Sequence, residues 1–202
     1  MENKDYLFPG IAALLLAVIH PFYWLGVGPL IGDNSMLWQD IINIGFNDFL
    51  FALIVLLNIY VYLSLKNILN EQLNFNHIDL LVMILITINA IWLSTLFLDL
   101  SSAVLPDTLI AQNKGIFLNI YVVIGIGAII VIGLVDLLIG VLLLMKLKEA
   151  PTLLKIFAVT SLIQGIAGMT IFLAGILIFV VPITLVILAM FFLRKPESIE
   201  IV

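Results

Sequence analysis

The sequence predicts an all-α fold, a polytopic transmembrane helical bundle with about six spans and both termini in the cytoplasm. Three observations lead to this prediction. First, 64% of the 202 residues are hydrophobic and only 10% are charged, whereas soluble domains average about 45–50% and about 25%. Second, apolar tracts long enough to cross a bilayer core about 30 Å thick recur between charges. Third, the basic residues gather on one side of these tracts. The strict alternation typical of a membrane β-barrel is missing.

Four spans follow from apolar tracts at about 7–27, 46–65, 78–98 and 116–145. The last tract, Ile156–Leu193, has 38 residues and no charge. One helix of that length would overshoot the bilayer at about 1.5 Å per residue. We therefore expect two spans, at about 153–172 and 175–193, with a turn near Phe172–Gly175. One span followed by a re-entrant segment is the alternative. In both cases residues 1–202 form a single transmembrane domain.

Charge asymmetry predicts the orientation. With the N-terminus inside, only Lys114 faces outward, and seven basic residues face the cytoplasm: Lys4, Lys66, Lys146, Lys148, Lys155, Arg194 and Lys195. This is the distribution that the positive-inside rule describes. The same topology places five acidic residues outside: Asp33, Asp40, Asp48, Asp99 and Asp107. We expect these carboxylates to be solvated loop residues, and concentration of cations at the outer face is the alternative.

The long loop between Gly28 and Gly45 contains a further helical signal. Its apolar residues recur at helical spacing after a group of turn residues. This pattern predicts an outer interfacial helix at about 35–44, with Trp38 at the depth of the lipid headgroups. A lid over the bundle or a surface for a partner protein is the alternative.

Polar residues recur at one depth in four consecutive spans. Asp136 lies ten residues before Lys146, or about 15 Å at helical rise, which is close to the bilayer midplane. Three carboxamides lie eight to ten residues from the charged inner ends of their own spans: Asn58, Asn89 and Gln164. If these helices turn their polar residues inward, one carboxyl group and three carboxamides form a layer in the middle of the membrane.

Small residues predict that this layer lies between helices. Gly133 and Gly140 flank Asp136 at i−3 and i+4, and the stripe Ser161, Gln164, Gly165 and Gly168 has the spacing of one helical face. Small residues allow two helix backbones to approach closely in a membrane. These faces are therefore expected to contact other helices and not lipid.

Two hypotheses account for Asp136. It could bind a substrate or ion or accept a proton, because ionisable residues inside membranes often mark such pathways. Alternatively, a protonated Asp136 could act as a polar clamp by hydrogen bonding to Asn58, Asn89 or Gln164, an interaction of about 0.6 to 2 kcal/mol that fixes helix register. With one carboxyl group and no buried cation nearby, the clamp is slightly favoured.

His20 is a second candidate binding residue, because Pro21 follows it. A proline frees a backbone carbonyl inside a helix, and that carbonyl and the imidazole could line a wet pocket near the outer face. A kink packed against neighbouring helices is the favoured alternative, since such carbonyls are usually satisfied locally.

The sequence predicts no catalytic residues, no metal site and no cofactor. Cysteine is absent, which excludes thiolate metal ligands and thiol nucleophiles. The two histidines, His20 and His77, are expected near opposite faces, so they cannot ligate one haem together. Hydrolase and nucleotide-binding motifs are also missing. An enzyme is therefore disfavoured, although not excluded.

The predicted function is a non-enzymatic accessory or scaffold subunit of a membrane assembly. The alternative is a small carrier or channel that uses a polar site around Asp136. The expected partners are the lipid bilayer and other membrane proteins or further copies of the chain, and no nucleic acid. The expected location is a membrane crossed several times, of the prokaryotic inner-membrane type.

Overall fold

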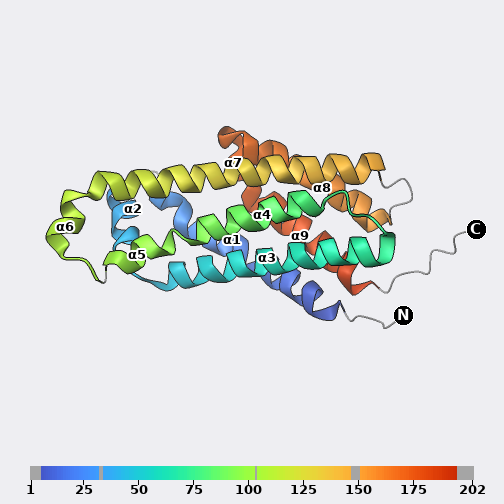
Figure 1. Ribbon diagram of the computed structural model, residues 1–202, viewed down its shortest axis with the longest axis horizontal. Helices are drawn as coiled ribbons and strands as arrows, with labels where there is room; N and C mark the ends of the chain where they lie inside the picture. Colours follow the sequence, from blue (N-terminus) through green and yellow to red (C-terminus); the bar gives the residue numbers. More distant parts are fainter. Residues whose placement is uncertain (1–5, 32–33, 103, 147–150, 195–202) are drawn as a thin grey trace, which may run out of the picture.

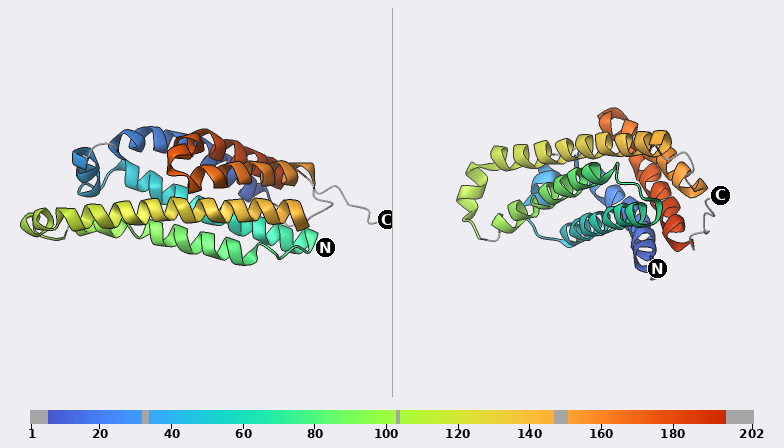
Figure 2. Two further views of the ribbon diagram at one scale, coloured as in Figure 1. Left: turned by 90° about the horizontal axis from the view of Figure 1, so that it is seen from above. Right: turned by 45° about the vertical axis from the view of Figure 1, so that its right-hand side comes forward.

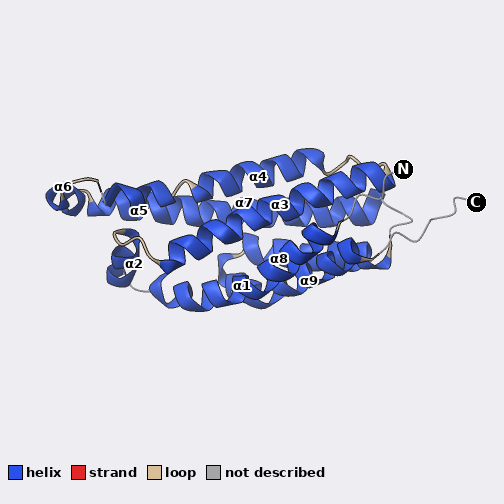
Figure 3. Cartoon of the chain, turned by 90° about the horizontal axis from the view of Figure 1, so that it is seen from below, coloured by secondary structure: helices blue, strands red, loops and turns tan. Residues whose placement is uncertain are grey.

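The computed structural model describes residues 6–31, 34–102, 104–146 and 151–194, and helices are the only regular elements in these segments (Figure 3). The helices are α1 (Leu7–Ile31), α2 (Asn34–Ile41), α3 (Phe46–Leu73), α4 (Asp79–Leu93), α5 (Leu96–Ser102), α6 (Asp107–Gln112), α7 (Lys114–Lys146), α8 (Thr152–Met169), the 3₁₀ helix η1 (Ile171–Ile176) and α9 (Leu177–Leu193).

Six helical segments in the described part of the chain are long and apolar enough to cross a membrane: Leu7–Gly26, Phe46–Leu73, Asp79–Ser101, Lys114–Lys146, Thr152–Met169 and Leu173–Leu193. The uncharged tract near the C-terminal end therefore holds two helices, α8 and α9. The 3₁₀ helix η1 connects them, so the chain reverses direction beyond Met169.

Local side-chain chemistry explains where several helices begin and end. The carboxylate of Asp48 accepts a 2.7 Å hydrogen bond from the backbone N–H of Gly45, which caps the start of α3. Asn74 ends α3 in the left-handed conformation, with a φ of 48°, which asparagine tolerates better than most residues. The hydroxyls of Ser94 and Thr95 donate to the backbone carbonyls of Ile91 and Trp92. These bonds compete with helical ones, and the chain makes a turn there between α4 and α5.

The six long helices form a closed ring. Around this ring, α1 packs against α3, α3 against α4, α4 against α7, α7 against α8, α8 against α9, and α9 against α1. The contact between α1 and α9 joins the two ends of the described chain, because the ring of Tyr6 stacks on that of Phe192 at 6.5 Å between centroids. The start of α1 and the end of α9 therefore lie at one end of the bundle (Figure 1).

The core is an apolar cluster to which all six long helices contribute, and Leu16, Leu65, Leu85, Ile139 and Phe157 are among its fully buried members. The outside of the bundle is also apolar: Phe8, Phe22, Phe97 and Phe179 are each at least 70% exposed. Such a surface is suited to lipid and not to water. Because lipid is as apolar as these side chains, helix association depends mainly on close packing and on hydrogen bonds.

The helix pair α8–α9 is shorter than its neighbours. It lies alongside only one half of α7, and the other half of α7 continues beyond it towards α6 (Figures 1 and 2). The helices α8 and α9 thus lie in the half of the bundle where α1 begins. The opposite end contains the first part of α7 together with α2, α5 and α6 (Figure 1).

Candidate functional site

The α7–α8 contact positions the candidate site, and it depends on glycine. A Cβ atom added to Gly165 would lie 2.5 Å from the backbone nitrogen of Leu137, and one added to Gly133 would lie 2.8 Å from the backbone carbonyl carbon of Gly168. A Cβ at Gly140 would lie 2.6 Å from the carbonyl oxygen of Ala158. The prediction that these small residues form an interhelical face is confirmed. The close approach brings Asp136 on α7 next to Gln164 on α8.

Asp136 is 1% exposed and uses both carboxyl oxygens. The hydroxyl of Tyr62 donates to Oδ1 at 2.8 Å, and Nε2 of Gln164 donates to Oδ2 at 2.5 Å. Tyr62 lies on α3, which packs against α1 and α4, whereas α7 packs against α4 and α8. The bond from Tyr62 therefore crosses the interior of the ring. We call these three residues the Asp136 cluster.

Tyr62 is not among the site residues that the sequence predicts. The predicted layer consists of carboxamides and one acid at a common depth, whereas Tyr62 lies only four residues from Lys66, the charge that bounds its predicted span. The tyrosine side chain is long enough to reach a group about one turn away. The position of Tyr62 along its helix therefore does not give the depth of its hydroxyl. The available signal was its position four residues after Asn58, on the same helical face.

Asn58 and Asn89 form a separate pair. Nδ2 of Asn58 donates to Oδ1 of Asn89 at 3.3 Å, and Nδ2 of Asn89 donates to the carbonyl of Leu85 at 2.8 Å. No hydrogen bond within the described residues connects this pair to Asp136. The expected single polar layer is thus two clusters, of which one joins α3 to α4 and the other joins α3, α7 and α8.

His20 lies in neither cluster. Its Nε2 accepts a 3.0 Å hydrogen bond from the indole N–H of Trp24, and because indole can only donate, the ring proton of a neutral His20 is on Nδ1. That Nδ1 is buried without a partner in the described part of the chain. Around Trp24, an aromatic cluster includes Tyr23, Phe51 and Trp92. The helix α1 runs through Pro21 without interruption.

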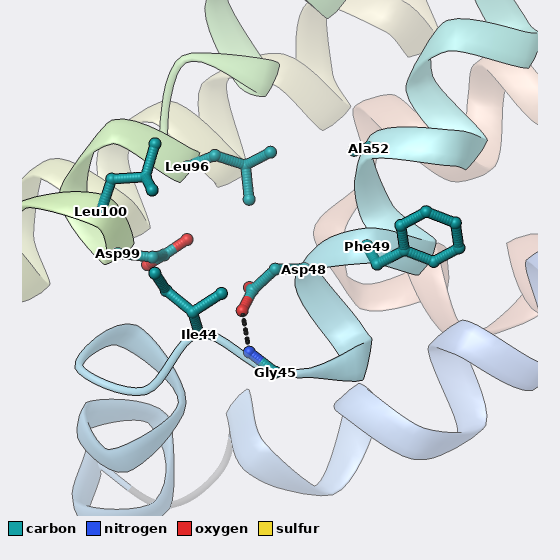
Figure 4. Close-up of a pocket in the computed structure, with 8 residues that line it drawn as sticks. All are labelled: Ile44, Gly45, Asp48, Phe49, Ala52, Leu96, Asp99 and Leu100. Carbon is teal, nitrogen blue, oxygen red and sulfur yellow. Dashed lines mark hydrogen bonds between the residues drawn. The ribbon is translucent and has the colours of Figure 1, made fainter. Parts of the chain in front are cut away.

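A pocket of about 250 Å³ lies elsewhere, between the start of α3, α5 and the segment that precedes α3 (Figure 4). Asp48 and Asp99 line it together with apolar side chains. The expectation that Asp99 is a solvated loop residue is wrong: Asp99 belongs to α5 and is 3% exposed. The predicted span ended one residue before it, whereas the helical segment continues and turns Asp99 inward.

The helix α2 occupies part of the predicted interfacial segment. It ends at Ile41 and so is shorter than expected at its C-terminal end. Trp38 contacts the first turn of α7: Nζ of Lys114 lies 5.2 Å from its ring centroid, and the ring of Phe117 meets it edge-on at 6.4 Å. These contacts attach α2 to the N-terminal end of α7.

In the part of the chain that the structure describes, the regular elements are all helical and six of them are long and apolar enough to cross a membrane, which indicates a multi-pass membrane protein. Comparisons with protein-family models, with curated proteins and with solved structures give no match for this chain. Within the described residues, no group of three histidine or acidic side chains is placed to hold a metal ion.

Proposed function

We propose that the chain is a non-enzymatic accessory or scaffold subunit of a membrane assembly, with six crossings and both termini in the cytoplasm. The observation that carries this proposal is that both carboxyl oxygens of Asp136 accept hydrogen bonds, one from Tyr62 and one from Gln164. A carboxyl group bound in this way connects three helices and has no oxygen left without a protein partner. It is therefore suited to holding the bundle together.

The distribution of charge supports the orientation. Lys66 forms an ion pair with Asp79 at 4.0 Å, and this pair lies at the junction of α3 and α4. Lys146 ends α7 and Lys155 lies in the first turn of α8. The C-terminal end of α7, the first turn of α8 and the junction of α3 and α4 lie at the end of the bundle where α1 begins and α9 ends (Figure 1). The positive-inside rule assigns that end to the cytoplasm.

A specific observation favours the carrier or channel as a second candidate. Oε1 of Gln164, the residue that contacts Asp136, and Oγ of Ser161, three residues earlier on α8, are buried without a hydrogen-bond partner in the described part of the chain. Unpaired buried polar atoms are uncommon and call for an explanation. Transient binding of a transported ion or proton in this region would explain them.

Purification in nanodiscs formed directly from the native membrane tests the scaffold proposal. A subunit is expected to elute with a second membrane protein, or with further copies of itself, in a fixed molar ratio. The ratio should be kept when the salt concentration and the lipid-to-polymer ratio change. A chain that is monomeric under every condition would contradict the proposal.

Asp136→Asn separates the two candidates. Asparagine can accept from Tyr62 and donate to Gln164 once the Gln164 amide turns over, so the fold should persist. Asp136→Leu, which can make neither bond, is the matched variant that a clamp does not tolerate. Proton flux into proteoliposomes is then measured with a pH-sensitive dye. The scaffold proposal expects wild type and D136N to match empty liposomes. Flux in wild type that D136N abolishes would support the carrier or channel instead.

A further inference from the structure

The charge state of Asp136 can be inferred from what surrounds it. The long helices packed against α7 are α4 and α8. The helix α8 contributes the buried polar residues Gln164 and Ser161. The buried polar residue of α4 is Asn89, which already forms hydrogen bonds with Asn58 and with a backbone carbonyl. From across the ring comes Tyr62. All of these groups are neutral under ordinary conditions.

Among the described residues, no buried cation balances a negative charge at this position. The buried polar and charged side chains in the described segments include two acids, Asp99 and Asp136, and neither lysine nor arginine. Lys146, the cation on the same helix, lies ten residues away, or about 15 Å at helical rise. An ionised carboxylate removed from water and left without a counter-charge is strongly disfavoured. Two neutral hydrogen-bond donors offset only part of that penalty.

A neutral carboxyl group needs an acceptor for its proton, and the cluster contains one. Nε2 of Gln164 contacts Asp136, while Oε1 of the same amide is buried without a partner within the described residues. The two ends of an amide have nearly the same size, so turning it over changes the hydrogen bonds but not the packing. In the turned orientation, Oε1 of Gln164 faces Oδ2 of Asp136 and accepts its proton. The bond from Tyr62 to Oδ1 is the same in both orientations.

We propose that Asp136 is a proton-binding site inside the bundle, in which the carboxyl group carries a proton on Oδ2 and donates it to Oε1 of Gln164, while Oδ1 accepts from Tyr62. The ligand is a proton, and the site is closed by α3, α7 and α8. Because Asp136 is 1% exposed, the proton can exchange with water only when these helices move apart. This inference concerns the state of the carboxyl group and holds whether the chain is a scaffold or a carrier.

Infrared spectroscopy of the protein in nanodiscs at neutral pH tests the proposal. The experiment uses chain labelled with ¹³C at the aspartate carboxyl carbon, on an Asp99→Asn background so that the second buried acid is silent. The expected result is an isotope-sensitive carbonyl band of a protonated carboxyl group that Asp136→Asn removes. A spectrum with only carboxylate bands from aspartate would overturn the proposal.

Tyr62→Phe provides a second measurement that does not require D136N to fold. Removing the hydroxyl takes a hydrogen bond away from the carbonyl oxygen of the neutral acid, so the band should move to higher frequency. Tyr60→Phe, on the same helix with a 43% exposed side chain, is the control and should leave the band in place. A band that both variants leave unchanged would assign the proton to another residue and contradict the proposal.

Discussion

The hydroxyl of Tyr62 donates a 2.8 Å hydrogen bond to Oδ1 of Asp136, and this bond joins α3 to α7 across the interior of the helix ring. Both residues are buried: Tyr62 is 5% and Asp136 is 1% exposed. Since helices in a membrane gain little from contacting each other instead of lipid, a bond of this kind has a large role in fixing their arrangement.

Tyr62→Phe is therefore expected to lower the free energy of unfolding by about 0.6 to 2 kcal/mol, the range measured for hydrogen bonds between membrane helices. The phenylalanine ring keeps the packing and removes only the donor. Reversible unfolding in bicelles measures the change. The same substitution at the exposed Tyr60 should have little effect, and an equal loss in both variants would argue against a special role for the Tyr62 hydroxyl.

Gly165→Ala is expected to destabilise the α7–α8 contact. The added methyl group would lie 2.5 Å from the backbone nitrogen of Leu137, which cannot move aside as a flexible side chain can. Overpacking of this kind costs about 1–3 kcal/mol, and thermal unfolding in detergent measures it. Gly127→Ala is the matched control, because nothing lies within 4 Å of the Cβ position there. If Gly127→Ala proves equally harmful, the effect is not one of helix packing.

Asp40→Asn tests the electrostatics of α2, outside the apolar spans. Burial raises the pKa of Asp40 above its ordinary value of 3.8; the hydrogen bond from Asn47 acts in the opposite direction, and the charge of Asp48 raises it further. The pKa of Asp40 is therefore higher in the folded chain than in the unfolded chain. The contribution of this carboxyl group to stability is fully present below the unfolded pKa and is lost as the pH rises through the folded pKa. Asp40→Asn should therefore raise the melting temperature near neutral pH.

The melting temperatures of wild type and Asp40→Asn should converge as the pH falls towards 4. Measurement of both proteins over a pH series checks this. A constant difference at every pH would show that the substitution acts through the hydrogen bond with Asn47 and not through charge.

Single cysteines can map the topology, because the chain has no native cysteine. Cysteine at Asn43 or at Gly175, both exposed, should react with a membrane-impermeant maleimide in intact cells. Cysteine at Gln72, exposed at the other end of α3, should react only after the membrane is opened. The Gly175 site tests the α8–α9 pair, since a re-entrant turn would leave it inside the membrane and unreactive.

Composition and tract length account for most of the fold. Runs of about 20 apolar residues require helices, because a backbone in lipid must satisfy its own hydrogen bonds. The same reasoning divides Ile156–Leu193 into two helices. It does not locate the turn at Ser94 and Thr95, because that break arises from side-chain hydroxyls bonding to the local backbone. Such competition depends on local geometry that hydropathy does not contain.

Only part of the candidate site can be predicted from the sequence. The position of Asp136 on a glycine-flanked face, and Gln164 on a matching face, follow from spacing along each helix, and the structure brings these two residues together. The partnership with Tyr62, the separation of Asn58 and Asn89 into their own pair, and the inward position of Asp99 were decided by tertiary structure. Helical spacing specifies which residues share a face, whereas the rotation and tilt of each helix, and the reach of its side chains, determine which faces meet.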